Sequence, residues 1–321
     1  MLTSLRTQAA AAACALAVAV TAPSAQAADW EPHKPIEMVI MAGQGGGADR
    51  LARFFQSLIQ KHDLTNMPVL PVNKGGGSGA EALRYMKDNA GDAHKVMATL
   101  NSYYTTPLRQ DIGVDIETFT PIARMAVDTF VLWVNADSDI HTLDEFVTAV
   151  KEADGSWKMG GTGTGQEDSL VTAMLEQEFG IKFTYVPFDG GGTVAKNLVG
   201  GHIDSTVNNP SEQLPFFRAG KSRPIATFTE ARLEPLPDVP TMTELGHDLT
   251  YGMQRSFVGA PGMPADAQQY YIDLFTKVSE SEEWQEYAAS EALDTKLLTG
   301  DALQEYFLKE RATHAKILGI N

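Results

Sequence analysis

Two glycine-rich segments offer the residue types best suited to binding chemistry. The first is Gly43-Gln44-Gly45-Gly46-Gly47, which follows a buried strand predicted at residues 35–42 and precedes a predicted helix. In such a loop, backbone N–H groups and the helix N-terminus can face a small anion. We therefore predict an anion site with Gln44, Gly45, Gly46 and Gly47 as ligand contacts. A purely structural tight turn is the alternative.

The same loop also fits the spacing of a dinucleotide-binding fingerprint, Gly43-x-Gly45-x-x-Ala48. That fingerprint needs an acidic residue at the end of the next strand, about 20 residues further on, to bind the ribose hydroxyls. The next predicted strand ends at Val72-Asn73-Lys74 and supplies no acid. We therefore expect no nicotinamide cofactor.

Asp49 is the acidic residue next to this loop, at the start of the predicted helix. Beside a bound carboxylate its charge would repel the ligand. At a helix start, however, a carboxylate can accept hydrogen bonds from free N–H groups and complement the helix dipole. We predict that Asp49 organises the loop and does not contact the ligand.

The second glycine-rich segment spans residues 160–165 and lies between a short predicted strand and a helix predicted at 168–179. Thr162 and Thr164 supply hydroxyl donors there, and the following helix supplies free N–H groups. Ligands of open α/β sheets bind beyond the carboxyl ends of the strands. We predict that Thr162, Gly163, Thr164 and Gly165 hold the other end of the ligand. A flexible turn with ordinary helix caps is the alternative.

Other catalytic patterns do not stand out in the sequence. The seven histidines occur singly, without H-x-x-x-H spacing, and the single cysteine excludes a Cys-based zinc site. Ser78, in Gly76-Gly77-Ser78-Gly79-Ala80, is one glycine short of a nucleophile elbow. No Ser–His–Asp spacing is evident, although a triad assembled in space stays an alternative. We expect no metal, no cofactor and no catalytic residue.

The first 27 residues are typical of a secretory signal peptide. Arg6 is followed by an apolar run at residues 9–20 and by the small-residue triplet Ala25-Gln26-Ala27. The run is shorter than the roughly 20 residues that cross a membrane. Cys14 lies inside the run and not at its end, which disfavours lipidation. We expect cleavage after Ala27 and a soluble protein in the periplasm of a Gram-negative cell.

The composition is that of an ordinary globular protein. Of the 321 residues, 43% are hydrophobic and 21% are charged, which disfavours intrinsic disorder. A net charge of −16 disfavours nucleic-acid binding, because phosphate contacts need clustered Lys and Arg.

Predicted strands and helices alternate along the chain, and the unit of strand, glycine loop and helix occurs in both halves. Thr142 and Glu145 form a capping box, and two helices are predicted near the C-terminus, at residues 265–279 and 301–317. The alternation predicts an α/β fold with two similar lobes, each a mostly parallel sheet flanked by helices.

Several segments, taken together and in order, resemble the receptor family of the tripartite tricarboxylate transporters, also called Bug proteins. No single segment is specific, but the set covers essentially the whole mature chain. The segments are KPI (34–36), GQGGGAD (43–49), PVNKGGGSG (71–79), FTPIA (119–123), YVPFDGGG (185–192), GGHID (200–204), LPDVPT (236–241), ELG (244–246) and GAPGMP (259–264). One departure is the entry of the first loop, where the family often has Pro and this chain has Ala42-Gly43-Gln44.

The resemblance implies a two-lobed Venus-flytrap fold, the periplasmic-binding-protein architecture, with two crossing segments. We expect lobe 1 at 28–128 plus 252–321 and lobe 2 at 129–251. The resemblance also implies a carboxylate in the interlobe cleft, held by N–H groups, hydroxyls and bridging waters. Residues 101–104 fall where a third cleft loop would lie, so Ser102 and Tyr103 are predicted ligand contacts, and Asp189 is added from the YVPFDGGG segment. A surface loop is the alternative for residues 101–104.

The sequence thus predicts an exported solute-binding receptor and not an enzyme. The resemblance implies that it delivers its ligand to a membrane permease, and that the ligand is a di- or tricarboxylate, an acidic amino acid or an aromatic acid. We expect a monomer with no nucleic-acid partner. An exported hydrolase or a dinucleotide-linked oxidoreductase is the alternative.

Overall fold

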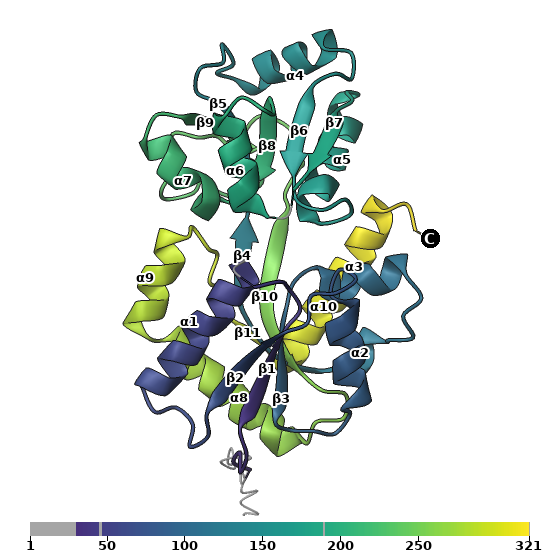
Figure 1. Ribbon diagram of the computed structural model, residues 1–321, viewed down its shortest axis with the longest axis vertical. Helices are drawn as coiled ribbons and strands as arrows, with labels where there is room; N and C mark the ends of the chain where they lie inside the picture. Colours follow the sequence, from purple (N-terminus) through teal and green to yellow (C-terminus); the bar gives the residue numbers. More distant parts are fainter. Residues whose placement is uncertain (1–29, 45–46, 189, 321) are drawn as a thin grey trace, which may run out of the picture.

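The computed structural model describes residues 30–44, 47–188 and 190–320 (Figure 1). The predicted signal peptide and Cys14 lie outside the described residues, as do Gly45, Gly46 and Asp189. None of the described helices is both long and apolar enough to cross a membrane.

The first of two sheets is mixed and has six strands. Its core is the parallel trio β2-β1-β3, and β10 runs antiparallel to both β3 and β4. β1 is apolar on both faces, as expected for a strand covered on both sides. In sheet order the strands are β11 (Leu298–Thr299), β4 (Thr120–Thr129), β10 (Gly252–Gly259), β3 (Lys95–Thr99), β1 (Ile36–Ile40) and β2 (Val69–Asn73).

Helices cover both faces of this sheet. One core joins Ile40 and Phe55 to Phe275, and the other joins Val39 and Leu83 to Phe307, so neighbouring residues of β1 serve opposite faces. The first face carries α1 (Gly47–Lys61), α8 (Ala265–Ser279) and α9 (Glu282–Ser290), and the second carries α2 (Ala80–Asp88), α3 (Ser102–Arg109) and α10 (Gly300–Ile317), with the short 3₁₀ turn η1 (Ile116–Thr118) nearby.

The second sheet has five strands and belongs to the other lobe. Beside its parallel trio β7-β6-β8, β5 runs antiparallel to both β8 and β9. In order the strands are β7 (Thr184–Pro187), β6 (Lys158–Gly161), β8 (Ser205–Asn208), β5 (Val131–Asn135) and β9 (Ser222–Thr227). One face packs on α4 (Leu143–Glu152) and α5 (Glu167–Phe179), and the other on α6 (Gly191–Val199) and α7 (Pro210–Arg218).

The α/β class and the two-lobed architecture predicted from the sequence are confirmed, but both sheets are mixed and not mostly parallel. The antiparallel members arise where the chain passes between lobes. β4 leads through Phe130 into β5, and the chain returns from β9 to β10 over residues 228–251. These passages cross between the lobes side by side (Figure 1). The exact lobe limits at 128/129 and 251/252 stay a prediction.

The C-terminal helix α10 belongs to lobe 1 but ends against lobe 2. Ile317 and Leu318 pack on the core of the second lobe. Just before them, His314 Nε2 lies 3.1 Å from the hydroxyl of Tyr251, at the return crossing. The end of α10 therefore braces the hinge from outside the cleft.

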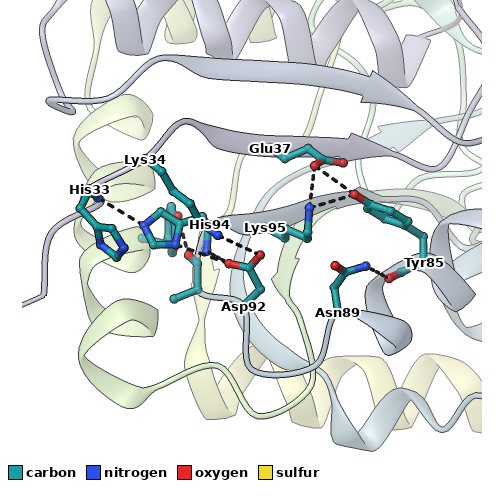
Figure 2. A network of polar contacts seen from close by, with 10 residues as sticks. His33, Lys34, Glu37, Tyr85, Asn89, Asp92, His94 and Lys95 are labelled. Carbon is teal, nitrogen blue, oxygen red and sulfur yellow. Dashed lines mark hydrogen bonds and ion pairs between the residues drawn. The ribbon is translucent and has the colours of Figure 1, made fainter.

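A polar network fixes the other end of the first sheet, at the amino ends of β1 and β3 (Figure 2). The Glu37 carboxylate accepts hydrogen bonds from Lys95 Nζ at 2.6 Å and from the Tyr85 hydroxyl at 3.0 Å. His94 Nε2 accepts from the His33 backbone N–H at 3.3 Å. The network anchors the amino end of β1. The candidate site lies at the opposite, carboxyl end of the same sheet.

Candidate functional site

A cavity of about 260 Å³ lies between the two lobes, at the carboxyl ends of the parallel strands of both sheets. This is the edge at which open α/β sheets bind ligands. The volume lies just below the roughly 300–1,000 Å³ range of drug-sized ligand sites, so the cavity suits a small solute. Residues of both lobes and of both crossing strands line it.

The lobe 1 wall is built from three helix starts. α1, α2 and α3 follow the three parallel strands β1, β2 and β3, so their N-termini meet at one edge of the sheet. The first-turn N–H groups of a helix have no partner within that helix, and the helix dipole adds positive potential there. Lining residues from these starts are Gly43, Gln44, Gly47, Ser78, Gly79 and Ser102. At α2 and α3 some of these N–H groups donate to the preceding turn, as those of Ala80 and Tyr103 do. The three helix dipoles and the remaining N–H groups suit this wall to an anion.

Asp49 is buried beside this wall but does not line the cavity. Its Oδ1 accepts hydrogen bonds from Arg53 Nε at 3.0 Å and from Asn73 Nδ2 at 3.0 Å. Asn73 also donates to the Ala42 carbonyl at 3.0 Å. These contacts tie the start of α1 to the ends of β1 and β2. They suit the predicted organising role of Asp49, which stays a prediction.

The cavity floor carries a buried ion pair that the sequence analysis missed. Arg255 on β10 donates through Nη2 to the carboxylate of Asp128 on β4, and each residue is less than a tenth exposed. The guanidinium also lies under the first glycine loop, since a Cβ added to Gly47 would stand 2.9 Å from Arg255 Nη2. The crossing strands thus place a cation directly below the start of α1.

The second glycine loop is already occupied by its own hydrogen bonds. The N–H of Thr162 donates to Asp168 Oδ2 at 2.7 Å, that of Gly163 to Gln166 Oε1 at 3.0 Å, and that of Gly165 to Ser169 Oγ at 2.6 Å. Thr164 is exposed, and neither it nor Gly163 lines the cavity. Of the four contacts predicted in this loop, Thr162 and Gly165 therefore line the cavity, whereas Gly163 and Thr164 do not, and the N–H groups of Thr162, Gly163 and Gly165 are bonded within lobe 2.

One side chain joins the two lobes across the cleft mouth. Arg109, at the end of α3, donates through Nη1 to the Gly165 carbonyl at 3.1 Å. Gly165 has a φ of +85°, and an added Cβ would collide with the Arg109 guanidinium. The glycine therefore permits both the left-handed backbone and the interlobe contact.

Three acidic side chains, Glu167, Asp168 and Glu212, line the lobe 2 wall beside the starts of α5, α6 and α7. Burial raises the pKa of Asp168 to about 7, with the neighbouring Glu167 acting in the same direction. Burial also raises the pKa of Glu212 to about 7, with Asp168 and Asp128 adding to the rise and Arg50 and Arg255 opposing it. Among the described residues, Glu212 Oε2 is fully buried and has no hydrogen-bond partner.

Tyr103 requires a correction. Residues 102–109 form helix α3 and not a loop, so successive side chains point in different directions. The Tyr103 side chain is 1% exposed, donates its hydroxyl to the Ile116 carbonyl at 3.0 Å and packs on Phe307. It lies in the core of lobe 1, whereas the adjacent Ser102 lines the cavity.

The structure thus brings together only part of the predicted site. Gln44, Gly47, Ser102, Thr162 and Gly165 line the cavity. Of the other predicted contacts, Gly163, Thr164 and Tyr103 lie off it, and Gly45, Gly46 and Asp189 lie outside the described residues. The lining residues that sequence analysis missed include Arg50, Arg109, Asp128, Glu167, Asn208, Asn209, Glu212 and Arg255. Of these, Asn208 and Asn209 had a signal, because polar side chains at the carboxyl end of a buried strand, here β8, lie at the edge where ligands bind.

No group of three His, Cys, Asp or Glu residues that could hold a metal occurs in the part of the chain that the structure describes. Two α/β lobes, two adjacent crossings and a polar cavity between them define a bilobed ligand receptor of the periplasmic-binding-protein class.

Comparison with known proteins gives the family. The profile described as "Tripartite tricarboxylate transporter family receptor" matches residues 52–317. The chain therefore belongs to this receptor family, as its sequence resemblance implied. It is 29% identical over 281 residues to a Cupriavidus necator protein described as "UPF0065 protein in gbd 5'region", covering 87% of this chain and 85% of that one. Bordetella pertussis BugT is 25% identical over 227 residues, 68% of each chain.

Solved structures agree with this assignment. A TctC solute-binding protein from Polaromonas has a TM-score of 0.74 and 27% identity, over 90% of this chain and 99% of that one. Two Rhodopseudomonas palustris structures share the fold with TM-scores of 0.78. MatC with bound malate is 19% identical, over 89% of this chain and 99% of its own, and Rpa4515 with adipate is 21% identical, over 90% and 97%. The family is a class of transporter receptors and not an enzyme class.

The acidic wall predicts a pH effect on the ligand-free protein. Because the pKa of Glu212 is about 7 in the folded protein and near 4.5 when unfolded, stability from this group is lost as pH rises through 7. Glu212→Gln should remove that loss. Urea unfolding should show the variant more stable than the parent at pH 8, by on the order of 1–3 kcal/mol, with little or none of this advantage at pH 5. An equal difference at both pH values would contradict the assignment.

The interlobe contact predicts an effect on ligand release. Arg109→Ala removes a hydrogen bond that only a closed cleft allows, so a ligand identified by thermal-shift screening should dissociate faster. The affinity should fall about threefold to tenfold, as for a lost hydrogen bond of about 0.5–1.5 kcal/mol. Gly165→Ala should act in the same direction in calorimetry.

Gly180→Ala is the matched control for Gly165→Ala. Gly180 also has a positive φ, of +61°, but a Cβ there meets no described atom within 4 Å. Both variants carry backbone strain, and only the one at 165 displaces Arg109. Equal affinity losses in the two glycine variants, or none in Arg109→Ala, would refute the contact's role.

Proposed function

We propose that this chain is an exported, monomeric receptor that captures a small carboxylate between its lobes and delivers it to the membrane permease of a tripartite transporter. The observation that carries the proposal is the lobe 1 wall, where three helix N-termini line the cavity and Arg255 lies below the start of α1. Helix N-termini bind anions through free N–H groups and through the dipole. The malate and adipate in structures of the same fold support a carboxylate as the ligand.

The remaining parts of the proposal follow from the family and from the sequence. A periplasmic receptor has to be exported, which the signal-peptide pattern of residues 1–27 provides. The receptor does not transform its ligand: the cavity holds it between two walls, and closure of the lobes shields it from water. A ligand that contacts both lobes favours the closed state by its difference in affinity for the two states.

Titration calorimetry against malonate, succinate, glutarate, adipate, malate and citrate, and against β-alanine, 4-aminobutanoate and 5-aminopentanoate, tests the proposal. A receptor should bind at least one of these compounds saturably, and the ligand should be recovered unchanged after denaturation of the protein. Chemical turnover of the ligand, or no binding of any carboxylate, would refute the proposal.

Gly47→Ala tests whether the carboxylate lies at the start of α1. The added Cβ would stand 2.9 Å from Arg255 Nη2 and displace the guanidinium, which is the far end of a flexible side chain. We expect about tenfold weaker binding, or ~1.4 kcal/mol, with an unchanged circular-dichroism spectrum. Gly192→Ala, where a Cβ meets no described atom within 4 Å and which is off the cavity wall, is the control. An unchanged affinity in Gly47→Ala would place the anion elsewhere.

A further inference from the structure

The two walls of the cavity differ in charge. The lobe 1 wall has helix N-termini and Arg50, and it stands over the Arg255 floor. The lobe 2 wall also has helix starts, those of α5, α6 and α7, but its charged side chains are Glu167, Asp168 and Glu212, and the N–H groups of Thr162, Gly163 and Gly165 in its glycine loop are bonded within the lobe. A ligand with a carboxylate at each end would have to place one of them beside these three acids.

Glu212 is the residue of this wall whose contacts most need an explanation. Its carboxylate lies over Gly191, at the start of α6, where an added Cβ would collide with it. An acid in the first turn of α7 ordinarily complements that helix's dipole. That role leaves Oε2 unexplained, because this atom is buried without a hydrogen-bond partner among the described residues. A buried carboxylate oxygen with no partner costs free energy unless a ligand donates to it.

The charged groups around Glu212 do not supply that donor. Asp168 and Asp128 raise the cost of its charge, while Arg50 and Arg255 lower it from the lobe 1 side and the floor. Arg255 donates to Asp128, and Arg109 donates to Gly165. A ligand cation placed against the cavity side of the Glu212 carboxylate would offset the surplus of negative charge on this wall.

We propose that the ligand is an amino-carboxylate, with its carboxylate at the N-termini of lobe 1 and its ammonium group hydrogen-bonded to Glu212 on lobe 2. This inference rests on the proposed function and narrows its ligand class. The ammonium carries three N–H donors and no acceptor, so it matches a wall of carboxylates. The ligand then bridges both lobes with complementary charge at each end, and closure aligns the two.

Matched ligand pairs test this assignment. Succinate and β-alanine, glutarate and 4-aminobutanoate, and adipate and 5-aminopentanoate have the same carbon spacer, and differ only by a carboxylate or an ammonium at one end. Titration calorimetry at pH 8 should show that the amino acid binds at least tenfold more tightly than the diacid in at least one pair. Binding of the amino acid should weaken as pH falls to 5, because Glu212 and Asp168 take up protons.

Tighter binding of the diacids than of the amino acids would also have a simple physical explanation. A protonated Glu212 could donate a hydrogen bond to a second ligand carboxylate. In that case the diacids bind more tightly than the amino acids, and their affinity falls as pH rises from 5 to 8. That result would overturn the inference and leave the proposed function standing. If no diacid, citrate or amino acid binds at any pH, both fail.

Substitutions of Glu212 and of the neighbouring glycines test where the ammonium group of the ligand binds. Glu212→Gln should weaken amino-acid binding at least tenfold and should not weaken binding of a diacid. Gly191→Ala displaces the Glu212 carboxylate and should act in the same direction, whereas Gly192→Ala adds a Cβ that meets no described atom within 4 Å and should bind like the parent. Loss of diacid and amino-acid binding to the same extent in Glu212→Gln would assign Glu212 a structural role and overturn the inference.

Discussion

The buried ion pair of Asp128 and Arg255 is the interaction on which the arrangement of the site depends. It joins β4 to β10, the strands at the two crossings between lobes, and it forms the floor of the cavity. Breaking a buried pair by removing one partner costs about 3–5 kcal/mol, because the other charge is left uncompensated. The pair therefore holds the hinge strands together and fixes a guanidinium below the start of α1.

Each wall takes its charge from backbone geometry as much as from side chains. On lobe 1, the parallel order β2-β1-β3 brings three helix N-termini to one edge without any buried lysine. On lobe 2, the corresponding loop uses its N–H groups internally, and three carboxylates stand among the helix starts of the wall. The raised pKa values of Glu212 and Asp168 record the cost of that arrangement. Binding sites commonly carry such a cost, and a bound ligand removes it.

Local patterns in the sequence were enough to predict many of the elements. The helix predicted at 265–279 is α8, and the capping box of Thr142 and Glu145 is present at the start of α4. The glycine loop after β1 borders the cavity as predicted, because a loop after a buried parallel strand must lie at its carboxyl end.

No local pattern in the sequence indicated the charged residues of the site. Asp128 and Arg255 are more than 120 residues apart in the sequence, and they are paired only through the β4–β10 register. Tyr103 was misplaced because a polar, aromatic segment was interpreted as a loop, although a helix turns the side chain at 103 into the core. The second glycine loop has a local explanation. The side chains of Gln166, Asp168 and Ser169, a few residues further on, accept hydrogen bonds from its N–H groups.

The central claim is that a ligand joins the two lobes across the cavity and holds them closed. Small-angle X-ray scattering of the mature protein, first freed of ligand by unfolding and refolding, tests it most directly. The account predicts a smaller radius of gyration when a ligand confirmed by calorimetry is added at saturation, with the parent's molecular mass unchanged. An identical radius of gyration with and without that ligand would contradict it.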